Sequence, residues 1–169
     1  NTFGGALHAD NVNFVRVQAC TFSRNEAHQN SPVLQTAAAL TFQSVPNPSA
    51  TGNIFWRNRV FSGSGEWPGD LQRQQILAAA SNPPVSLSRN LLEGAALKDT
   101  DNTDQDPLFV SDFSDYRLRA SSPAINAGRG SYPGYDLDGN PRTVGGTVDL
   151  GAFEFQGAPQ PPAATLSSV

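Results

Sequence analysis

Residues 15–25 read VRVQACTFSRN, and the second half of this stretch returns twice along the chain. Apolar and polar side chains alternate in it, which is the pattern of a β-strand. The second half, CTFSRN from Cys20, recurs 33 residues later as NIFWRN from Asn53. A weaker copy, NLLE, begins at Asn90, another 37 residues on. Similarity at a nearly constant period is the signature of a repeat architecture.

Equivalent residues of such a repeat stack along one axis if each copy forms one coil of a solenoid. The repeat then predicts two columns of side chains, one of Phe22, Phe55 and Leu92 and one, at a corner, of Cys20, Asn53 and Asn90. Asparagine suits a corner because it tolerates the left-handed backbone region and its amide can bond to the coils on either side. The alternative, three similar strands of an ordinary β-sandwich, stays open at this point.

Residues 106–154 consist of short apolar runs separated by Ser-Pro, Asn-Ala-Gly, Asp-Gly and Gly-Gly, which are too closely spaced for ordinary helices. Five motifs follow one another here: DPLF from Asp106, YRL from Tyr116, SPAINAG from Ser122, DLDGNPR from Asp136 and VDLGAFE from Val148. This series resembles the C-terminal end of secreted bacterial right-handed parallel β-helix proteins. These form the pectate-lyase-like group, whose C-terminal part is often called a choice-of-anchor domain.

The resemblance implies an all-β fold, a right-handed parallel β-helix of about three to four coils with a C-terminal closing segment. It also implies a bacterial protein that is secreted or displayed at the cell surface. We expect coils with loop excursions in residues 1–105, a terminal coil and cap in 106–156, and a tail rich in Pro, Ala and Ser in 157–169. The group contains polysaccharide lyases, hydrolases and adhesins, so the resemblance indicates the fold and leaves the activity open.

Two segments are predicted to loop out of the coils, residues 26–48 and 62–82. Within the first, residues 36–42 (TAAALTF) fit either a helical turn or a strand, because periodicity does not separate the two in so short a run. Within the second, residues 70–80 (DLQRQQILAAA) are the best helix candidate in the chain, with Asp70 as its cap. The resemblance instead implies a strand there.

The composition excludes several classes of protein and site. The formal net charge is −4 and the basic residues are scattered, which argues against a nucleic-acid partner. The single cysteine, Cys20, allows neither an intrachain disulfide nor a cysteine-based zinc site. No stretch approaches the roughly 18 apolar residues of a membrane span, so we expect no membrane insertion. The chain starts at Asn1 and has no methionine, and we expect a processed piece of a longer secreted precursor.

Two acidic stretches are candidate calcium sites, because calcium takes several oxygen ligands. The candidate ligands are Asp99, Asp101 and Asp104 in the first stretch and Asp136 and Asp138 in the second. A solvated acidic loop explains the first stretch with fewer assumptions, and a β-turn at Asp138-Gly139 explains the second. No other cofactor is expected.

Catalytic residues are weakly indicated. The lyases of the resembled group use acidic calcium ligands with an arginine or lysine base, which makes Asp10, Arg24 and Arg57 the candidates, with Glu26 and Glu93 as further carboxylates on the coils. The repeat stacks Arg24 over Arg57, either as a solvated face or as a ladder that contacts the hydroxyls and carboxylates of a sugar. His8 and His28 are isolated, with no nucleophile motif beside them.

Aromatic side chains suggest a further candidate, a platform for a glycan. Its members would be Trp56, Trp67, Tyr132 and Tyr135. Trp56 is expected to point out of the coil, because its neighbour Phe55 takes the core side. We expect residues 62–82 to cover it.

The sequence therefore predicts a non-catalytic extracellular or cell-surface module with a structural or adhesive role. The alternative is the C-terminal part of a polysaccharide lyase or glycoside hydrolase whose active coils lie upstream. Residues 4–7 (GGAL) enter directly into the first coil, with no amphipathic helix ahead of them, so we expect this coil to contact other coils of the precursor or another copy of the chain end to end. Polysaccharide is a further expected partner, and residues 157–169 could pair with a neighbour as an extended arm.

Overall fold

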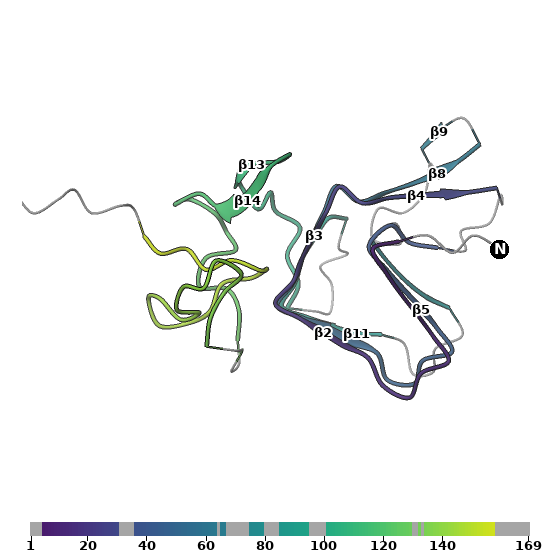
Figure 1. Cartoon of the computed structure of the whole chain (residues 1–169), viewed down its shortest axis with the longest axis horizontal. Helices are drawn as coiled ribbons and strands as arrows, with labels where there is room; N and C mark the ends of the chain where they lie inside the picture. The colour runs from purple at the N-terminus through teal and green to yellow at the C-terminus, as the bar shows by residue number, and fades with distance from the viewer. Residues whose placement is uncertain are drawn as a thin grey trace, which may run out of the picture.

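The computed structural model describes residues 5–30, 36–63, 65–66, 75–79, 85–94, 101–129, 132 and 134–157. These residues form an all-β fold, and apart from the helical Gln75 none of them lies in a helix (Figure 1). The strands are β1 Leu7–Asp10, β2 Arg16–Gln18, β3 Thr21–Ser23, β4 Glu26–Gln29, β5 Leu40–Gln43, β6 Ser49–Thr51, β7 Ile54–Trp56, β8 Arg59–Ser62, β9 Gly65–Glu66, β10 Ile76–Ala79, β11 Ser86–Ser88, β12 Leu91–Leu92, β13 Phe109–Ser111 and β14 Asp115–Leu118.

The chain runs through the same sheets in the same order three times. Strands β1–β4 form a first pass, β5–β8 a second and β10–β12 a third, and they pair in parallel as β1-β5-β10, β2-β6-β11, β3-β7-β12 and β4-β8. Successive passes therefore overlie one another in Figure 1. Four registers share the 33-residue step of the sequence repeat: Leu7 with Leu40, Arg16 with Ser49, Thr21 with Ile54 and Glu26 with Arg59. Stacked parallel sheets of this kind are consistent with a parallel β-helix.

The first column is an apolar core between the sheets. Phe22 is in register with Phe55, and Phe55 with Leu92. The two phenyl rings stack with their centroids 5.1 Å apart and an interplanar angle of 7°. Phe55 and Leu92 are fully buried, in one cluster with Leu40 and Phe42. Since each buried side chain of this size contributes roughly 1.5–3 kcal/mol, the column supplies a large part of the stability of the stack.

The second column is a continuous ladder of hydrogen bonds, which we call the asparagine ladder (Cys20, Asn53, Asn90 and Asn102). The backbone N–H of Cys20 donates to Oδ1 of Asn53 at 2.9 Å, that of Asn53 to Oδ1 of Asn90 at 3.0 Å, and that of Asn90 to Oδ1 of Asn102 at 2.9 Å. Each interior amide group also donates backwards, Asn53 to the Val17 carbonyl and Asn90 to the Ala50 carbonyl. Both side chains are fully buried. Every polar group that the corner buries between passes is thus satisfied within the stack.

The left-handed residue of this corner is not the asparagine, which corrects the reason given above for its presence. The positive φ angles belong to the preceding residues, 51° at Ala19, 72° at Gly52 and 51° at Arg89. A turn made one residue earlier leaves the asparagine side chain directed along the stack, where it can bond to both neighbours. A non-glycine residue in this region costs about 1–2 kcal/mol. The corner tolerates that cost because the asparagine that follows hydrogen-bonds to the buried polar groups of the neighbouring passes, which would otherwise lack partners.

A second ladder follows the next corner of each pass. The backbone N–H and the side-chain amide of Asn25 donate to Oδ1 of Asn58 at 3.0 and 2.8 Å. Asn58 in turn donates to the Phe22 carbonyl and to Oε1 of the buried Gln75. Here too a left-handed residue precedes each asparagine, with φ of 57° at Arg24 and 56° at Arg57. Both arginines therefore project from equivalent corners of successive passes.

Residues 106–157 lie beside the stack, where Figure 1 draws them in green and yellow. They pack on the outer face of the sheet β3-β7-β12, because alternate residues of each strand face opposite ways. Phe55 faces the core, and its neighbour Ile54 faces out. Outward-facing Ile54 and Leu91 form a second apolar cluster, with Phe109, Leu118, Ala124 and Leu150 from the C-terminal segment. The C-terminal segment thus covers one side of the stack.

Close backbone contact holds this segment in place. The Gly151 N–H donates to the Gly52 carbonyl at 2.9 Å, and the Ala152 N–H donates to Oγ1 of Thr21 at 3.0 Å. A Cβ atom on Gly151, whose φ is +91°, would lie 2.7 Å from Thr21 Oγ1 and 2.8 Å from Ile54 Cδ1. The glycine of the VDLGAFE motif is therefore required by packing against the sheet.

Several local predictions change in the structure. Ile76–Ala79 form strand β10, so the helix expected over residues 70–80 is wrong there; Gln75 is helical, and residues 70–74 and 80 lie outside the described part. Leu40–Gln43 likewise form a strand. Strands β4 and β5 pair within the sheets, so residues 26–48 do not leave the stack as a whole. In both places burial in a parallel sheet overrides local helix propensity.

We predict that Asn53→Ala lowers the free energy of unfolding by about 3 kcal/mol, because it removes the side-chain partner of the Cys20 N–H and of the Val17 carbonyl and one of the two bonds to Asn90 Oδ1. Asn25→Ala removes a single side-chain bond at the end of the second ladder and should cost about 1 kcal/mol. Urea unfolding of both variants measures the difference. Equal losses would show that the ladder has no special weight.

Candidate functional site

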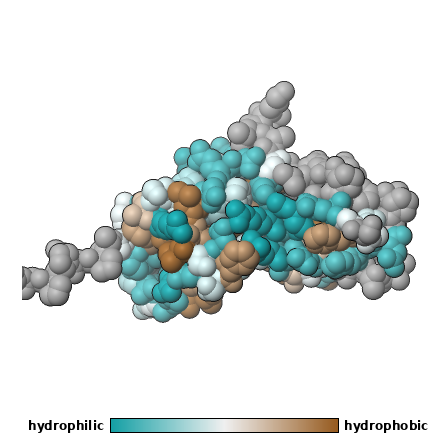
Figure 2. All heavy atoms as spheres, turned by 90° about the horizontal axis from the view of Figure 1, so that it is seen from above, coloured by the Kyte–Doolittle hydropathy of each residue, from teal (hydrophilic) through white to brown (hydrophobic). Residues whose placement is uncertain are grey.

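The most developed polar site lies at the corner between β3 and β4. It consists of Arg24 and Arg57 at equivalent corners of two passes, and of Glu26 and Arg59. These last two are the first residues of β4 and β8 and are in register with each other. Together these four side chains line a depression of about 210 Å³. We call this group, with Asp112 and Phe113 beside it, the arginine corner. Figure 2 looks onto this side of the molecule and shows a hydrophilic band across its middle, with apolar groups next to it.

Two of the three arginines are neutralised by carboxylates. Arg59 donates from both terminal nitrogens to Glu93 at 2.7 Å each, and its Nε lies 3.0 Å from Glu66. The hydrogen bond to Glu93 raises the pKa of Arg59 and outweighs the opposite effect of burial. Glu93 also accepts the backbone N–H of Arg57 at 2.7 Å, and the Arg57 side chain donates to Asp112 at 2.5 Å. These two arginines therefore join the passes to each other and to the C-terminal segment.

Arg24 differs from the other two. It is exposed, and no carboxylate pairs with it in the described part of the chain. Its guanidinium carbon lies 3.9 Å from the centroid of the Phe113 ring, a cation–π contact. Phe113 is 75% exposed in the turn between β13 and β14. An unpaired guanidinium beside an open aromatic face can hold a carboxylate and stack on an apolar ring face at the same time.

The structure does not bring the three catalytic candidates together. Asp10 ends β1 in the sheet β1-β5-β10, whereas Arg24 and Arg57 follow β3 and β7 in another sheet. The histidines lie apart as well. His28 stacks on Phe61 with ring centroids 5.1 Å apart, and His8 is an exposed residue of β1.

The first candidate calcium stretch is engaged in other contacts where it is described. Asp101 forms an ion pair with Arg89 at 3.2 Å, and Asp104 accepts the Gly94 N–H at 3.0 Å. Asp99 lies outside the described residues. Within the described ranges no three histidine, cysteine or acidic residues are grouped so that they could hold a metal ion. Calcium binding stays a prediction.

The second stretch is a turn organised by one carboxylate. Asp136 accepts the N–H groups of Asp138 and Asn140 through Oδ1, at 3.0 and 2.8 Å, and that of Glu154 through Oδ2 at 3.0 Å. Burial raises the pKa of Asp136, but these hydrogen bonds together outweigh burial and lower the pKa below its ordinary value. Asp138 is exposed, with a carboxylate oxygen 3.8 Å from Arg117. The turn thus needs no ion to hold its shape.

The aromatic residues do not form one platform. Trp56 points out of the core as expected and packs against the second apolar cluster. Most of residues 62–82, which were expected to cover it, lie outside the described residues. Tyr132 lies against Gly52, where a Cβ would meet its hydroxyl at 2.1 Å. Tyr135 is largely exposed, and Trp67 lies outside the described residues.

Three residues of the arginine corner were not predicted from the sequence: Arg59, Asp112 and Phe113. Arg59 and Glu26 are related by the same 33-residue step as the ladders, so the repeat could have paired them. Phe113 stands within Ser111-Asp112-Phe113-Ser114-Asp115, where an aromatic residue surrounded by turn formers signals exposure. The pairing of Asp112 with Arg57 spans 55 residues and has no local signal.

Comparisons with known proteins add no relative to this picture. No protein-family model, curated protein sequence or solved structure matches the chain. Among the described residues there is no helix with the length and apolar character to span a membrane.

We predict that Asp136→Ala destabilises the protein by about 1–2 kcal/mol at neutral pH, since three N–H groups lose a charged acceptor at a partly solvated site. Because the folded-state pKa is lowered, this contribution is present above the ordinary pKa and is lost as the pH falls through the folded-state pKa. Unfolding free energies at neutral pH and at about pH 2.5 measure the change. Asp138→Ala is the control and should have little effect at either pH; a pH-independent loss in Asp136→Ala would contradict the assignment.

Proposed function

We propose that this chain is a right-handed parallel β-helix module of about three to four coils, secreted or displayed at a bacterial surface, with a structural or adhesive role. Three passes through the same parallel sheets support this architecture. The asparagine ladder and the 33-residue register support it as well, because both require equivalent residues to stack along one axis. The resemblance of residues 106–154 to the C-terminal ends of pectate-lyase-like proteins points the same way.

The ligand of the module, in this proposal, is an acidic polysaccharide held at the arginine corner. The carrying observation is the contact of Arg24 with Phe113, 3.9 Å from guanidinium carbon to ring centroid. A uronate residue offers a carboxylate, which matches the planar guanidinium, and a sugar face, which stacks on an aromatic ring. The long, shallow surface of a stack suits a polymer better than a small substrate.

The proposed role is non-catalytic, and the engagement of Glu93 and Asp112 supports it, with Glu26 as the one carboxylate lining the depression. Glycoside hydrolysis uses two carboxyl groups across the scissile bond. Here Glu93 and Asp112 accept short hydrogen bonds from Arg59 and Arg57, which hold them as ion-pair partners. The proposed task of the corner is binding.

The same proposal assigns the open side of the first pass to a further coil, either of the precursor or of another copy. Each of the strands β1–β4 has a pairing neighbour on one side only in the described part of the chain. Unpaired strand edges of this kind are normally covered in natural proteins.

We predict that the protein binds polygalacturonate and that Arg24→Gln weakens the binding about tenfold, which corresponds to roughly 1.4 kcal/mol. Calorimetric titration with the polymer, at low and at raised salt, measures the effect; salt should weaken binding by the wild type because the contact is exposed. Phe113→Ala should weaken binding to uncharged oligosaccharides as well, since it removes the stacking surface.

Arg16→Gln provides a matched control. Arg16 is also exposed and also lies over a phenylalanine, with its guanidinium carbon 5.3 Å from the Phe14 centroid, but it is on β2, outside the corner. Its substitution should leave the affinity unchanged. Equal affinity of wild type and Arg24→Gln, or cleavage of the polymer during titration, would overturn the proposal.

A further inference from the structure

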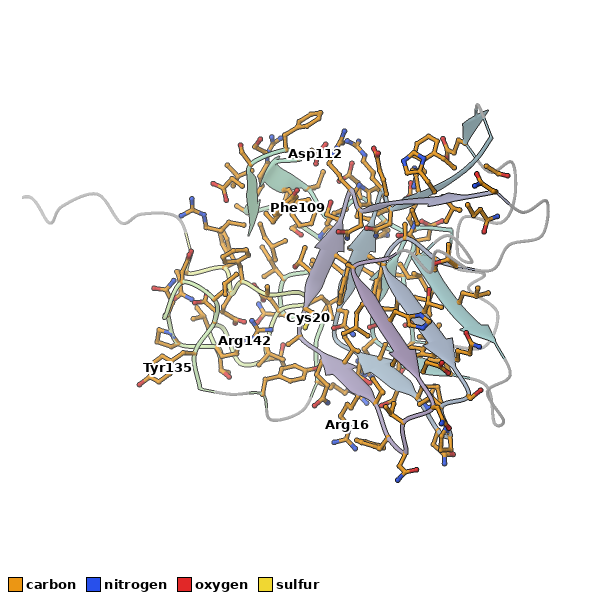
Figure 3. The ribbon with its side chains drawn as sticks, turned by 45° about the vertical axis from the view of Figure 1, so that its right-hand side comes forward. Arg16, Cys20, Phe109, Asp112, Tyr135 and Arg142 are labelled. Atoms are coloured by element: carbon orange, nitrogen blue, oxygen red, sulfur yellow. The ribbon has the colours of Figure 1, made fainter. Side chains whose placement is uncertain are left out.

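A second hollow lies between the corner before β3 and the loops of the C-terminal segment. Its volume is about 510 Å³, and we call it the flank pocket, lined among others by Cys20, Phe22, Tyr135, Leu137, Arg142 and Ala152. Most of its lining is apolar. Pockets of roughly 300–1,000 Å³ with mainly apolar walls and a few polar groups are typical sites for small molecules. In Figure 3, Arg142 lies between Tyr135 and Cys20.

Arg142 is the unusual group of this pocket. It is only 4% exposed, and among the described residues its side chain forms one hydrogen bond, from Nη2 to the Gly151 carbonyl, and a cation–π contact with Tyr132, 5.7 Å from guanidinium carbon to ring centroid. No carboxylate pairs with it in the part of the chain that the structure describes. A guanidinium has five N–H donors, so most of its capacity is unused. A buried cation in this state is costly unless an anion compensates it.

The nearby carboxylates do not fill this role. Asp136, which also lines the pocket, accepts three backbone N–H groups. Asp149 accepts the N–H groups of Asn126 and Phe155 at 2.7 and 2.6 Å. Glu154 accepts those of Val144 and Asp149 at 2.9 Å each. The negative charges of Asp149 and Glu154 act on Arg142 through space. Burial, however, raises the pKa of both carboxyl groups and so disfavours their charged forms. The oxygens are committed to the backbone, and the guanidinium is left for another acceptor.

We propose that the flank pocket binds a small aromatic monocarboxylate, with its carboxylate on Arg142 and its ring against Phe22 and Leu137. Charge complementarity fixes the anion, and the apolar walls fix the character of the rest of the ligand. Leu137 is 73% exposed at the mouth, where an apolar ligand would remove it from water. The site is separate from the arginine corner, so it stands or falls independently of polysaccharide binding.

Cys20 supplies a built-in reporter for the test. It is the single cysteine of the chain, it lines the pocket, and its thiol donates to the Gln18 carbonyl at 3.1 Å. Burial raises the pKa of this thiol more than that hydrogen bond and the charge of Arg142 lower it, so labelling needs a mildly alkaline buffer. A ligand in the pocket should shield the sulfur from a thiol reagent.

The experiment measures the rate at which iodoacetamide labels Cys20 in the wild type, with cinnamate or with its neutral amide, each at up to about 10 mM. Cinnamate should slow labelling about tenfold or more, and cinnamamide should have little effect. Arg142→Gln should abolish protection, and Ala152→Phe should abolish it by filling the pocket while Arg142 stays in place. Arg119→Gln, an exposed arginine outside the pocket, should behave as wild type.

Ala152→Phe and the acid-against-amide comparison in the wild type keep the test decisive even if Arg142→Gln does not fold. Equal protection by acid and amide would overturn the role of Arg142. No protection by cinnamate, or full protection in Ala152→Phe, would overturn the pocket as a binding site.

Discussion

The hydrogen bonds of the asparagine ladder are the constraint on which the rest of the structure depends. Hydrogen bonds between parallel strands fix the register within each sheet, but they do not fix the corners between sheets. Asn53 and Asn90 fix the corners, because each side chain bonds to the passes on either side. Fixed corners keep Phe22 over Phe55 in the core and, one corner later, Arg24 over Arg57 at the surface. The arginine corner is thus a product of the same repeat.

The alternation of the strand β7 explains why the chain needs its C-terminal segment. Phe55 belongs to the core, while Ile54 on one side of it and Trp56 on the other face outward. Two apolar faces on one sheet require two apolar partners, and residues 106–157 provide the second. The indole Nε1 of Trp56 is buried there with no hydrogen-bond partner among the described residues, a local cost that the apolar contact outweighs. The segment also forms one wall of the flank pocket, which therefore exists only because the segment lies beside the stack.

The sequence allowed the main features that repeat to be predicted. The columns of Phe22 and Asn53 follow from a 33-residue step, and stacked parallel sheets follow from them. Asn102 was missed because it follows Asn90 by only 12 residues and so breaks the period. Residues 76–79 have the composition of a helix, but pairing of Ile76 with buried Leu40 overrides it. Arg142 ends the DLDGNPR motif, but its burial could not be predicted, because it depends on contacts formed across the fold.

The unequal spacing of the ladder residues shows that the stack does not fix the number of residues in the connections between strands. Asn53 follows Cys20 by 33 residues and Asn90 follows Asn53 by 37, yet the hydrogen bonds at the two steps have nearly the same length. The extra residues of the longer step are taken up between strands, without moving the corners. Surface connections can therefore gain or lose residues while the stack keeps its dimensions. The fold is for this reason a natural carrier for grafted loops, in which inserted sequence is presented at a fixed height along a rigid axis.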